Sequence, residues 1–593
     1  MNKKIKYPIL FLLLLLIVGS SYQMLQLPLW GYWTLLQFIS TWSFIVLLLE
    51  KRFSSFPQNS RWLFLSTLSG LLLAIGFPTS PLTPIMFIGF VPILMIEREL
   101  SQHKEGPSKA VLFRYSYHAF VVWNILTTFW VGNTAYIGGV VAILTNSLFM
   151  SVPIVLFHQT SKVLRRNFAP AAFIAYWLAW EYLHLNWEIS WPWLTLGNSF
   201  AQYPSWVQWY EYTGAFGGSF WILLVNVLVV KWLITEKETA IRWDTKVLLK
   251  IGGIILIPIL ISLGIYHTYE EQGALSEVVV VQPNFEPHYE KFAVSQRDQL
   301  EQFVSLSKEA LTTNTNYLVF PETSLGVFYN KNVGKERYTK SLKELVDEYP
   351  KLNLVTGLVT RKIFRRGEEE LHTRATRTHI NRTRGDTIYW ELYNAAVQIS
   401  AETDSIPIYF KSKQVPGAEM MPYPQLFFFL KPLADKLGGS LSGHGKQKER
   451  TAFKSSSGGV GPMICYESVY GEYATGYVRH GANALFIITN DGWWDNTPGH
   501  LQHLKFASLR AIETRRAIAR SANTGISCFV NQRGDILQAT KYNEATAIKG
   551  QIPMNNSYTF YVRWGDVIGR IAVFLTILLL LNSFVKSKMG VKE

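Results

Sequence analysis

The chain has 593 residues, of which 49% are hydrophobic and only 17% are charged, and its formal net charge is +15. This length allows several domains, and the apolar content is unusual for a soluble protein. Nucleic-acid binding is not expected, because the lysines and arginines fall mainly in short loops between apolar stretches and in one unpatterned insert. Only two cysteines occur, Cys465 and Cys528, and CxxC and HExxH motifs are absent, so we expect no structural disulfide, no metal and no cofactor.

Long apolar stretches dominate the first 270 residues and return near the C-terminus. A membrane-spanning helix needs about 20 apolar residues, with about 17–25 as the usual range. The ten candidates are 8–27, 32–50, 62–77, 83–97, 115–131, 137–157, 171–187, 217–235, 249–267 and 566–585. The fourth is short and holds Pro84 and Pro92, so a re-entrant segment is the alternative there. A cleavable signal peptide is the alternative for the first, but no small-residue cleavage site follows it, which favours an anchor.

The basic residues give an independent test of this pattern. Loop lysines and arginines fall in alternate segments between the expected helices, whereas the intervening loops 28–31, 78–82, 132–136 and 188–216 contain none. Positively charged loops stay in the cytoplasm during insertion. The pattern therefore predicts cytoplasmic termini, with residues 268–565 on the outer side of the membrane.

The chain is expected to divide into four parts. These are N-terminal transmembrane helices over 1–55, a transmembrane bundle over 56–270, an extracytoplasmic domain over 271–560, and a C-terminal helix with a cytoplasmic tail over 561–593. The whole is thus predicted to be a polytopic α-helical membrane bundle plus an α/β extracytoplasmic domain.

Strands and helices alternate in the third part, which predicts layered α/β structure. The expected strands are 277–282, 317–320, 352–359, 395–399, 406–410, 484–489 and 526–530. The expected helices are 296–312, 337–348 and 502–520. Residues 364–386 are rich in Arg, Glu and Thr without an apolar period, which indicates a solvated hairpin or loop. Residues 431–460 are rich in Gly, Ser and Lys and are expected to be mobile.

Three polar residues of complementary chemistry each follow an apolar run. Cys465 follows Val460–Ile464, Glu322 follows Phe320-Pro321, and Lys411 follows Tyr409-Phe410. A thiol at neutral pH is mostly protonated and needs a base or a positive neighbour to become a nucleophile. Glutamate can be the base, and lysine can stabilise an oxyanion. Taken singly, a buried free cysteine, a helix-capping acid and a surface lysine are the commoner interpretations. The prediction therefore depends on their shared placement at strand ends.

These segments, Phe320-Pro321-Glu322, Tyr409-Phe410-Lys411 and Ile464-Cys465-Tyr466-Glu467, resemble the three motifs of the nitrilase superfamily, and within it those of the bacterial apolipoprotein N-acyltransferase family. Further similarity to that family lies in Thr489–Trp494, His503–Asn523 and Trp191–Leu194. The resemblance covers about residues 60–585. It implies a nitrilase-like αββα sandwich attached to a membrane bundle.

The resemblance also implies a reaction. Cys465 would take an acyl chain from a phospholipid as a thioester, and the α-amine of an N-terminal diacylglyceryl-cysteine on an apolipoprotein would accept it. Glu322 would be the general base, and Lys411 would hold the oxyanion. The residues implied to support the site or bind substrate are Glu419, Tyr466, Glu467 and Trp493. The implied setting is a bacterial inner membrane, with a periplasmic catalytic domain on a monomer among membrane lipids.

The chain departs from the family in three places. Gln414–Glu419 differs from the family's usual loop after the lysine, residues 8–50 add two helices to the family's eight, and the insert 364–386 has no counterpart. An aromatic segment, Leu426–Leu430, is expected either to dip into the bilayer and gate lipid access or to form a short piece of buried core.

Two other functions fit parts of the pattern. A membrane-tethered amidase would use the same three residues with water as the acceptor. A transporter with an extracytoplasmic binding domain is disfavoured, because the apolar stretches hold few charges. Glu181, with His184 close by, is the exception and is expected to make a packing or headgroup contact.

Overall fold

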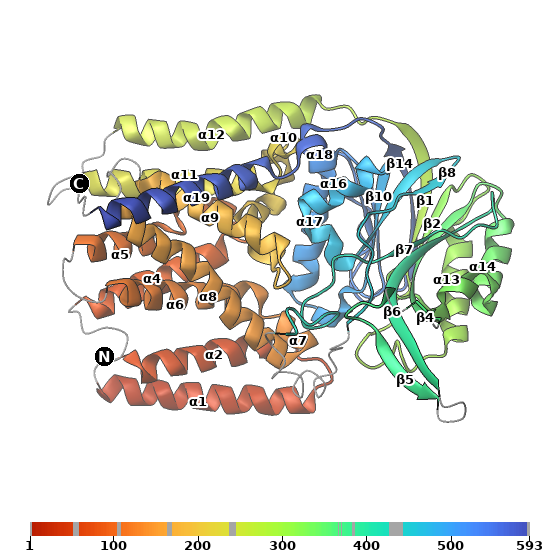
Figure 1. The fold of residues 1–593 in the computed structure, drawn as a ribbon, viewed down its shortest axis with the longest axis horizontal. Helices are drawn as coiled ribbons and strands as arrows, with labels where there is room; N and C mark the ends of the chain where they lie inside the picture. Colours follow the sequence, from red (N-terminus) through yellow and green to blue (C-terminus); the bar gives the residue numbers. More distant parts are fainter. Residues whose placement is uncertain are drawn as a thin grey trace.

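The computed structural model describes residues 3–50, 58–102, 108–162, 169–235, 245–365, 367–368, 371–381, 386–425 and 443–589. These residues form two parts that follow each other along the long axis, a bundle of helices and an α/β domain (Figure 1). The N- and C-terminal ends lie at the end of the bundle that faces away from the sheets. The aromatic segment 426–430 lies outside the described residues.

Each of the ten predicted apolar stretches forms helix. The long helices of the bundle are α1 (Lys3–Gln26), α2 (Trp33–Leu48), α4 (Asn59–Ile75), α5 (Val91–Gln102), α6 (Ser108–Thr128), α8 (Tyr136–Ser161), α9 (Ala169–Asn186), α11 (Ala215–Thr235), α12 (Thr245–Thr268) and α19 (Val567–Lys588). Within the described residues, five are long and apolar enough to cross a membrane, namely α1, α8, α11, α12 and α19. The others are shorter or more polar; α6, for example, buries His118 and Asn124. That all ten span the bilayer stays a prediction.

The fourth apolar stretch is divided rather than continuous. Its first part is the 3-10 helix η1 (Thr83–Ile88), and its second part is α5. Pro84 and Pro92 each lie in the first turn of one of these pieces, where a missing N–H group leaves no helical hydrogen bond unmade. The two prolines therefore mark two helix starts.

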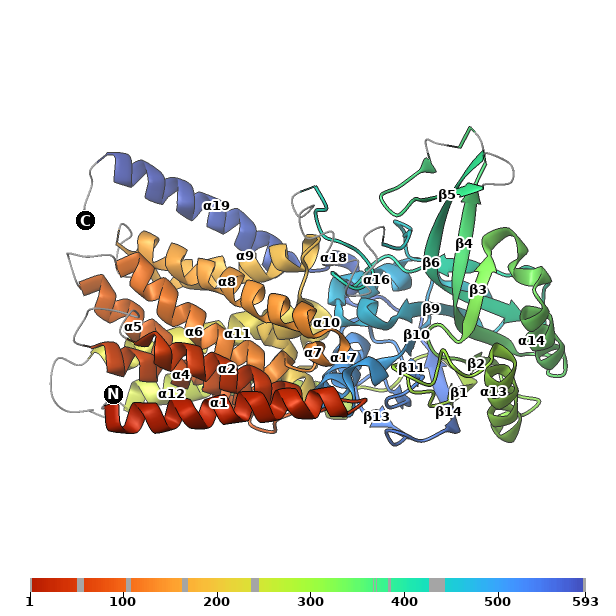
Figure 2. The same ribbon diagram turned by 90° about the horizontal axis from the view of Figure 1, so that it is seen from below.

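The α/β domain consists of two sheets with a helical layer outside each (Figures 1 and 2). The first sheet has the order β14-β1-β2-β4-β6-β5, with β3 paired to β4 and β7 paired to β6. Its strands are β1 (Ala274–Gln282), β2 (Tyr317–Val319), β3 (Leu325–Tyr329), β4 (Asn353–Phe364), β5 (Arg377–Asn381), β6 (Asp386–Ser400), β7 (Ile408–Phe410) and β14 (Thr546–Met554). Helices α13 (Gln296–Ala310) and α14 (Arg337–Asp347) cover its outer face.

The second sheet lies between the first sheet and the bundle. Its order is β13-β12-β11-β10-β9-β8. These strands are β8 (Phe453–Ser455), β9 (Gly458–Ile464), β10 (Ala484–Thr489), β11 (Ile518–Ala522), β12 (Cys528–Val530) and β13 (Ile536–Leu537). Helices α16 (Gly471–Arg479) and α17 (Pro498–Thr514) separate this sheet from the bundle. The four layers confirm the predicted αββα sandwich.

The valine run of β1 shows how the layers form. Successive side chains on a strand point to opposite faces. Val278 and Val280 belong to the core shared with the second sheet, whereas Val279 and Val281 pack in the core under α13 and α14. All four are fully buried, as expected for a strand covered on both faces.

Three predictions within this domain need correction or completion. The helix expected over 502–520 ends at Thr514, and Arg515 adopts the left-handed region with φ 48°. In the described part of the insert 364–386, β5 pairs antiparallel with the start of β6, while residues 382–385 lie outside the described residues. Part of 431–460, expected to be mobile, forms β8 and the start of β9; residues 431–442 lie outside the described residues.

Helix α17 joins the two parts of the chain. Gln502 donates hydrogen bonds to the carbonyl oxygens of Pro78 and Thr127, at 2.9 and 3.0 Å. At the other end of α17, Arg515 lies 2.9 Å from the carboxylate of Glu211. The helix stops before Arg520 because Ile518–Ala522 form β11, which pairs in parallel with β10.

Candidate active site

Glu322, Lys411 and Glu419 form one buried ionic cluster on the first sheet. Lys411 Nζ lies 3.1 Å from Glu322 Oε1 and 2.9 Å from Glu419 Oε1. Lys411 is 2% exposed and Glu322 is 7% exposed. Lys411 directly follows β7, and its backbone N–H donates to the carbonyl of Asn394 on β6 at 2.8 Å. The strand ends therefore bring the glutamate and the lysine of the sequence motifs into direct contact.

Two polar side chains that the sequence did not single out complete the cluster. Asn394 donates from Nδ2 to Glu322 Oε1 at 2.7 Å and to Glu419 Oε1 at 3.1 Å. Lys291 donates from Nζ to the carbonyl oxygen of Glu322 at 3.2 Å and to Thr323 Oγ1 at 2.7 Å. In the sequence, an amide directly before an expected strand is the one signal for Asn394, and no pattern marks Lys291.

The charges of this cluster balance. Two carboxylates, Glu322 and Glu419, are matched by two buried ammonium groups, Lys411 and Lys291. Burial lowers the pKa of Lys291 to about 8, although the charge of Glu322 opposes this change. Buried charges are tolerated only when they are paired and hydrogen-bonded. The cluster meets that condition without a metal ion, and no metal-binding group of His, Cys, Asp and Glu is found in the described part of the chain.

Cys465 lies at the end of a strand of the second sheet. It directly follows β9 and begins the short 3-10 helix η8 (Cys465–Val469). Its φ of 49° lies in the left-handed region, which costs a non-glycine residue about 1–2 kcal/mol. Thr323, beside Glu322, has φ 51°. Such strain persists where the surrounding contacts over-determine the backbone, and it is common at active sites.

The Cys465 thiol and the charges of the ionic cluster act on each other electrostatically. Burial raises the pKa of the Cys465 thiol well above its ordinary value, and the Glu322 carboxylate raises it further, while Lys411 opposes both. Although burial opposes it, the charges of Glu322, Glu419 and Cys465 raise the pKa of Lys411. At neutral pH the thiol is therefore protonated and the lysine is charged. Attack by sulfur requires a base to remove the thiol proton.

Glu467 connects the cysteine turn to the lysine strand. Its Oε1 accepts from the backbone N–H of Ser412 at 2.7 Å, and its Oε2 accepts from the backbone N–H of Ile464 at 2.9 Å. Ser412 follows Lys411 and Ile464 precedes Cys465, so one carboxylate holds both segments. Three tyrosine hydroxyls also donate to it, from Tyr409, Tyr473 and Tyr477. Glu467 is fully buried and supports the site from behind.

A second buried network holds the backbone of Cys465. His503 Nε2 lies 3.2 Å from the Cys465 carbonyl oxygen and 2.8 Å from Ser468 Oγ, and Nδ1 lies 3.0 Å from Asp491 Oδ1. Asp491 also pairs with Arg520. Although burial raises it, the charges of Arg520 and His503 lower the pKa of Asp491 overall. Segments 489–494 and 503–523 of the resemblance thus meet behind the cysteine.

Tyr466 and Trp493 link the site to the helical bundle. The Tyr466 hydroxyl donates to the carbonyl of Ser190 at 2.9 Å. The Trp493 carbonyl accepts from Thr134 Oγ1 at 3.0 Å, and its ring lies 5.2 Å from that of His288. Both residues therefore lie where the α/β domain meets the helical bundle.

Glu181 makes a packing contact inside the bundle. Its Oε1 accepts from the backbone N–H of Leu196 at 2.8 Å and from Trp177 Nε1 at 3.1 Å. It therefore anchors the loop that follows α9. This contact agrees with the packing alternative.

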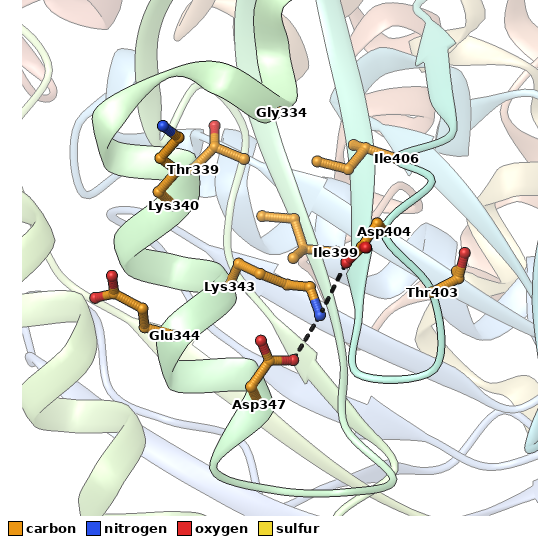
Figure 3. Close-up of a pocket in the computed structure, with 10 residues that line it drawn as sticks. All are labelled: Gly334, Thr339, Lys340, Lys343, Glu344, Asp347, Ile399, Thr403, Asp404 and Ile406. Carbon is orange, nitrogen blue, oxygen red and sulfur yellow. Dashed lines mark hydrogen bonds and ion pairs between the residues drawn. The ribbon is translucent and has the colours of Figure 1, made fainter.

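A separate cleft lies on the outer side of the first sheet (Figure 3). It has a volume of about 350 Å³ and lies between α14 and the connection from β6 to β7. Lys343 pairs there with Asp347 at 2.5 Å and lies 3.7 Å from Asp404. None of the residues predicted for the active site lines this cleft.

Similar proteins cover both parts of the chain. The apolipoprotein N-acyltransferase of Chlorobaculum tepidum is 29% identical over 548 residues, which are 89% of this chain and 98% of that protein. The apolipoprotein N-acyltransferase of Geobacter metallireducens is 25% identical over 525 residues, 87% of this chain and 93% of that protein. The crystal structure of Saccharomyces cerevisiae Nit3, a member of branch 10 of the nitrilase superfamily, matches 50% of this chain and 97% of its own, with 14% identity and a TM-score of 0.33.

The α/β domain is a carbon–nitrogen hydrolase domain. Residues 278–560 match the Carbon-nitrogen hydrolase family model, and the αββα layers with an acid, a lysine and a cysteine at strand ends agree with that class. In the bundle, residues 69–228 match the model of the Apolipoprotein N-acyltransferase N-terminal domain. The chain belongs to the apolipoprotein N-acyltransferase family.

Proposed function

We propose that this chain transfers an acyl group from a phospholipid to the α-amine of the N-terminal diacylglyceryl-cysteine of an apolipoprotein, through a thioester on Cys465. The observation that carries the proposal is the buried Lys411–Glu322 ion pair beside a thiol that needs a base. The family models and the names of the relatives support the acyl-transfer reaction and the lipoprotein acceptor.

In the first half-reaction the phospholipid ester carbonyl is the electrophile. The Cys465 thiol passes its proton to Glu322 as sulfur bonds to the carbonyl carbon. Negative charge develops on the carbonyl oxygen, and the Lys411 ammonium stabilises it. The ester C–O bond then breaks, and Glu322 returns the proton to the departing oxygen. The products are a thioester on Cys465 and a lysophospholipid.

In the second half-reaction the lipoprotein amine attacks the thioester. The new C–N bond forms while Glu322 takes a proton from the nitrogen. The C–S bond then breaks, and the proton passes from Glu322 to sulfur, which restores the thiol. Lys411 again faces the oxyanion. One base and one cation therefore serve both steps, as ping-pong chemistry requires.

The position of the site suits substrates that stay in a bilayer. Withdrawing an acyl chain into water costs about 0.8 kcal/mol per CH₂ group. The catalytic domain packs directly on one end of the bundle, and both chain ends, with Lys3 and Lys586, lie at the other. This arrangement and the basic loops support a periplasmic site at a bacterial inner membrane. One chain contributes all the proposed catalytic residues, so the proposed reaction needs no second subunit.

Mass spectrometry of the purified protein in phospholipid vesicles tests this function. With isotope-labelled phospholipid we expect one acyl mass on the peptide that contains Cys465. A diacylglyceryl-cysteine peptide should discharge it as an amide product. Release to water at the same rate with and without the peptide would instead indicate the amidase alternative, and absence of any adduct would contradict the acyl-enzyme.

A further inference from the structure

The first two helices form a hairpin at the edge of the bundle. α1 and α2 end before residue 69, where the matched model of the bundle begins. α1 packs mainly against α2 and is otherwise exposed, while α2 contacts α6. Trp42 of α2 donates from Nε1 to His118 of α6 at 3.0 Å.

The tip of the hairpin binds a carboxylate of the catalytic domain. The backbone N–H groups of Trp30 and Gly31 donate to Asp495 Oδ2 at 3.0 and 2.8 Å. Asp495 is 3% exposed. A hydrogen bond to a charged group contributes about 1.5–3 kcal/mol, more than a neutral one. The contact therefore holds the hairpin tip against residues 493–495, the Trp493–Asp495 loop.

The backbone at Asp495 shows that its side chain matters. Its φ of 55° lies in the left-handed region, which glycine adopts freely and other residues adopt at a cost of about 1–2 kcal/mol. A residue needed only for the turn would favour glycine. An aspartate there indicates that the carboxylate offsets the cost. Its Oδ2 accepts from the hairpin tip, and its Oδ1 lies 4.0 Å from His288 Nδ1.

Other bonds hold the same loop from the membrane side. Asn133 Nδ2 donates to the Gly31 carbonyl at 3.1 Å and to the Trp494 carbonyl at 3.4 Å. Thr134 Oγ1 donates to the Trp493 carbonyl at 3.0 Å. Asp491 lies just before this loop, and its partner His503 contacts the Cys465 carbonyl oxygen. A contiguous set of contacts thus joins the hairpin tip to the nucleophile turn.

We infer that the α1–α2 hairpin braces the Trp493–Asp495 loop, and that Asp495 is the positioning residue through which this added hairpin supports acyl transfer. The effect on transfer depends on the proposed function, whereas the brace itself does not. Asp495 acts through the loop and has no role as acid, base or nucleophile.

Two substitutions of Asp495 distinguish the role of its carboxylate from the role of its backbone conformation. Asp495→Gly relieves the left-handed strain but removes the acceptor, and Asp495→Asn keeps an oxygen that can accept both N–H groups. We expect kcat/KM for the lipopeptide acceptor to fall about tenfold in Asp495→Gly, the equivalent of about 1.4 kcal/mol, and to stay within about threefold in Asp495→Asn. Asp404→Gly, in the separate cleft, is the matched control and should leave transfer unchanged.

Hydrogen exchange gives a readout that does not depend on activity. Exchange should accelerate at residues 28–33 and 491–498 in Asp495→Gly, and much less in Asp495→Asn, with helices α6 and α17 unaffected. Unchanged exchange at both segments in Asp495→Gly would overturn the brace. Faster exchange with unaltered transfer would overturn its link to catalysis. A wild-type protein without transfer activity would refute the proposed function alone, because exchange still tests the brace.

Discussion

The two sheets hold their halves of the site by different means. On the first sheet, Lys411 is fixed by charge, because Glu322 and Glu419 contact its ammonium and Asn394 bridges the same two carboxylates. On the second sheet, Cys465 carries no charge at neutral pH and is fixed by a strained turn whose backbone is held from behind. Substitutions on the first sheet should therefore change stability and chemistry together, whereas the nucleophile can be removed with little effect on stability.

The largest effect should come from Cys465→Ala. We expect no thioester and a loss of acyl transfer of at least about 10³-fold, because the step has no other nucleophile. The unfolding temperature should stay close to that of the wild type, since the thiol is in no ion pair. Mass spectrometry and thermal unfolding measure the two expectations. An acyl adduct on the same peptide of this variant would refute the assignment of the nucleophile.

Lys411→Met tests the half of the site that lies on the first sheet. It leaves the buried Glu322 carboxylate and the half-buried Glu419 carboxylate without their cation, so we expect a loss of about 3–5 kcal/mol in the free energy of unfolding together with loss of thioester formation. Lys413→Met is the matched control. Lys413 Nζ donates to the Leu185 carbonyl at 2.9 Å and lies over the Tyr470 ring. If the control variant lost more activity than Lys411→Met, the assignment of the lysine would be wrong.

Glu467→Gln tests the residue that connects the lysine segment of the first sheet to the cysteine turn of the second sheet. The amide cannot accept at both oxygen positions, so one backbone N–H, of Ser412 or Ile464, loses its partner. We expect kcat to fall about 10–100-fold with little change in KM, as for residues that orient a catalytic group. Steady-state kinetics measures both constants.

Tyr477→Phe removes one hydroxyl from the same carboxylate and should cost about 1 kcal/mol of stability.

Lys291→Met tests whether the charge of Lys291, which lies behind Glu322, makes the free energy of unfolding depend on pH. Burial lowers the pKa of Lys291 to about 8, below the value of about 10.4 for an exposed lysine. Between these values the unfolded chain binds one proton more than the folded chain. The free energy of unfolding of the wild type should therefore gain up to about 1.4 kcal/mol per pH unit from this residue.

Denaturant unfolding from pH 7 to pH 10 measures that slope. Lys291→Met should lack the contribution, and Lys308→Met, which alters a half-exposed lysine on α13, should retain it. Equal slopes in the wild type and Lys291→Met would show that the charge behind Glu322 is not sensitive to pH in this range.

The smallest effect on acyl transfer should come from Cys528→Ser. Cys528 is fully buried on β12 and contributes no group to the proposed chemistry. Burying a hydroxyl costs about 1–3 kcal/mol of stability, whereas acyl transfer per folded molecule should match the wild type. Thiol labelling of this variant reports on Cys465 alone. An inactive but folded variant would mean that the second cysteine has a chemical role.

The sequence by itself determined the features that depend on local periodicity. The valines of β1 alternate between two cores as the period of a strand requires. The helix expected over 296–312 forms as Gln296–Ala310, and the apolar stretches form helices. The same local signals placed Glu322, Lys411 and Cys465 beside strand ends, because a polar residue that closes an apolar run marks where a buried strand stops.

The tertiary structure alone decided which polar groups meet. Asn394 reaches both carboxylates, and Lys291 reaches the carbonyl of Glu322, only because neighbouring strands and loops are packed together. Asp495 meets Trp30, which lies 465 positions earlier in the chain. Contacts of this kind depend on how two sheets and a bundle dock. No local period encodes that docking, since hydrophobic patterning specifies which face is buried but not what covers it.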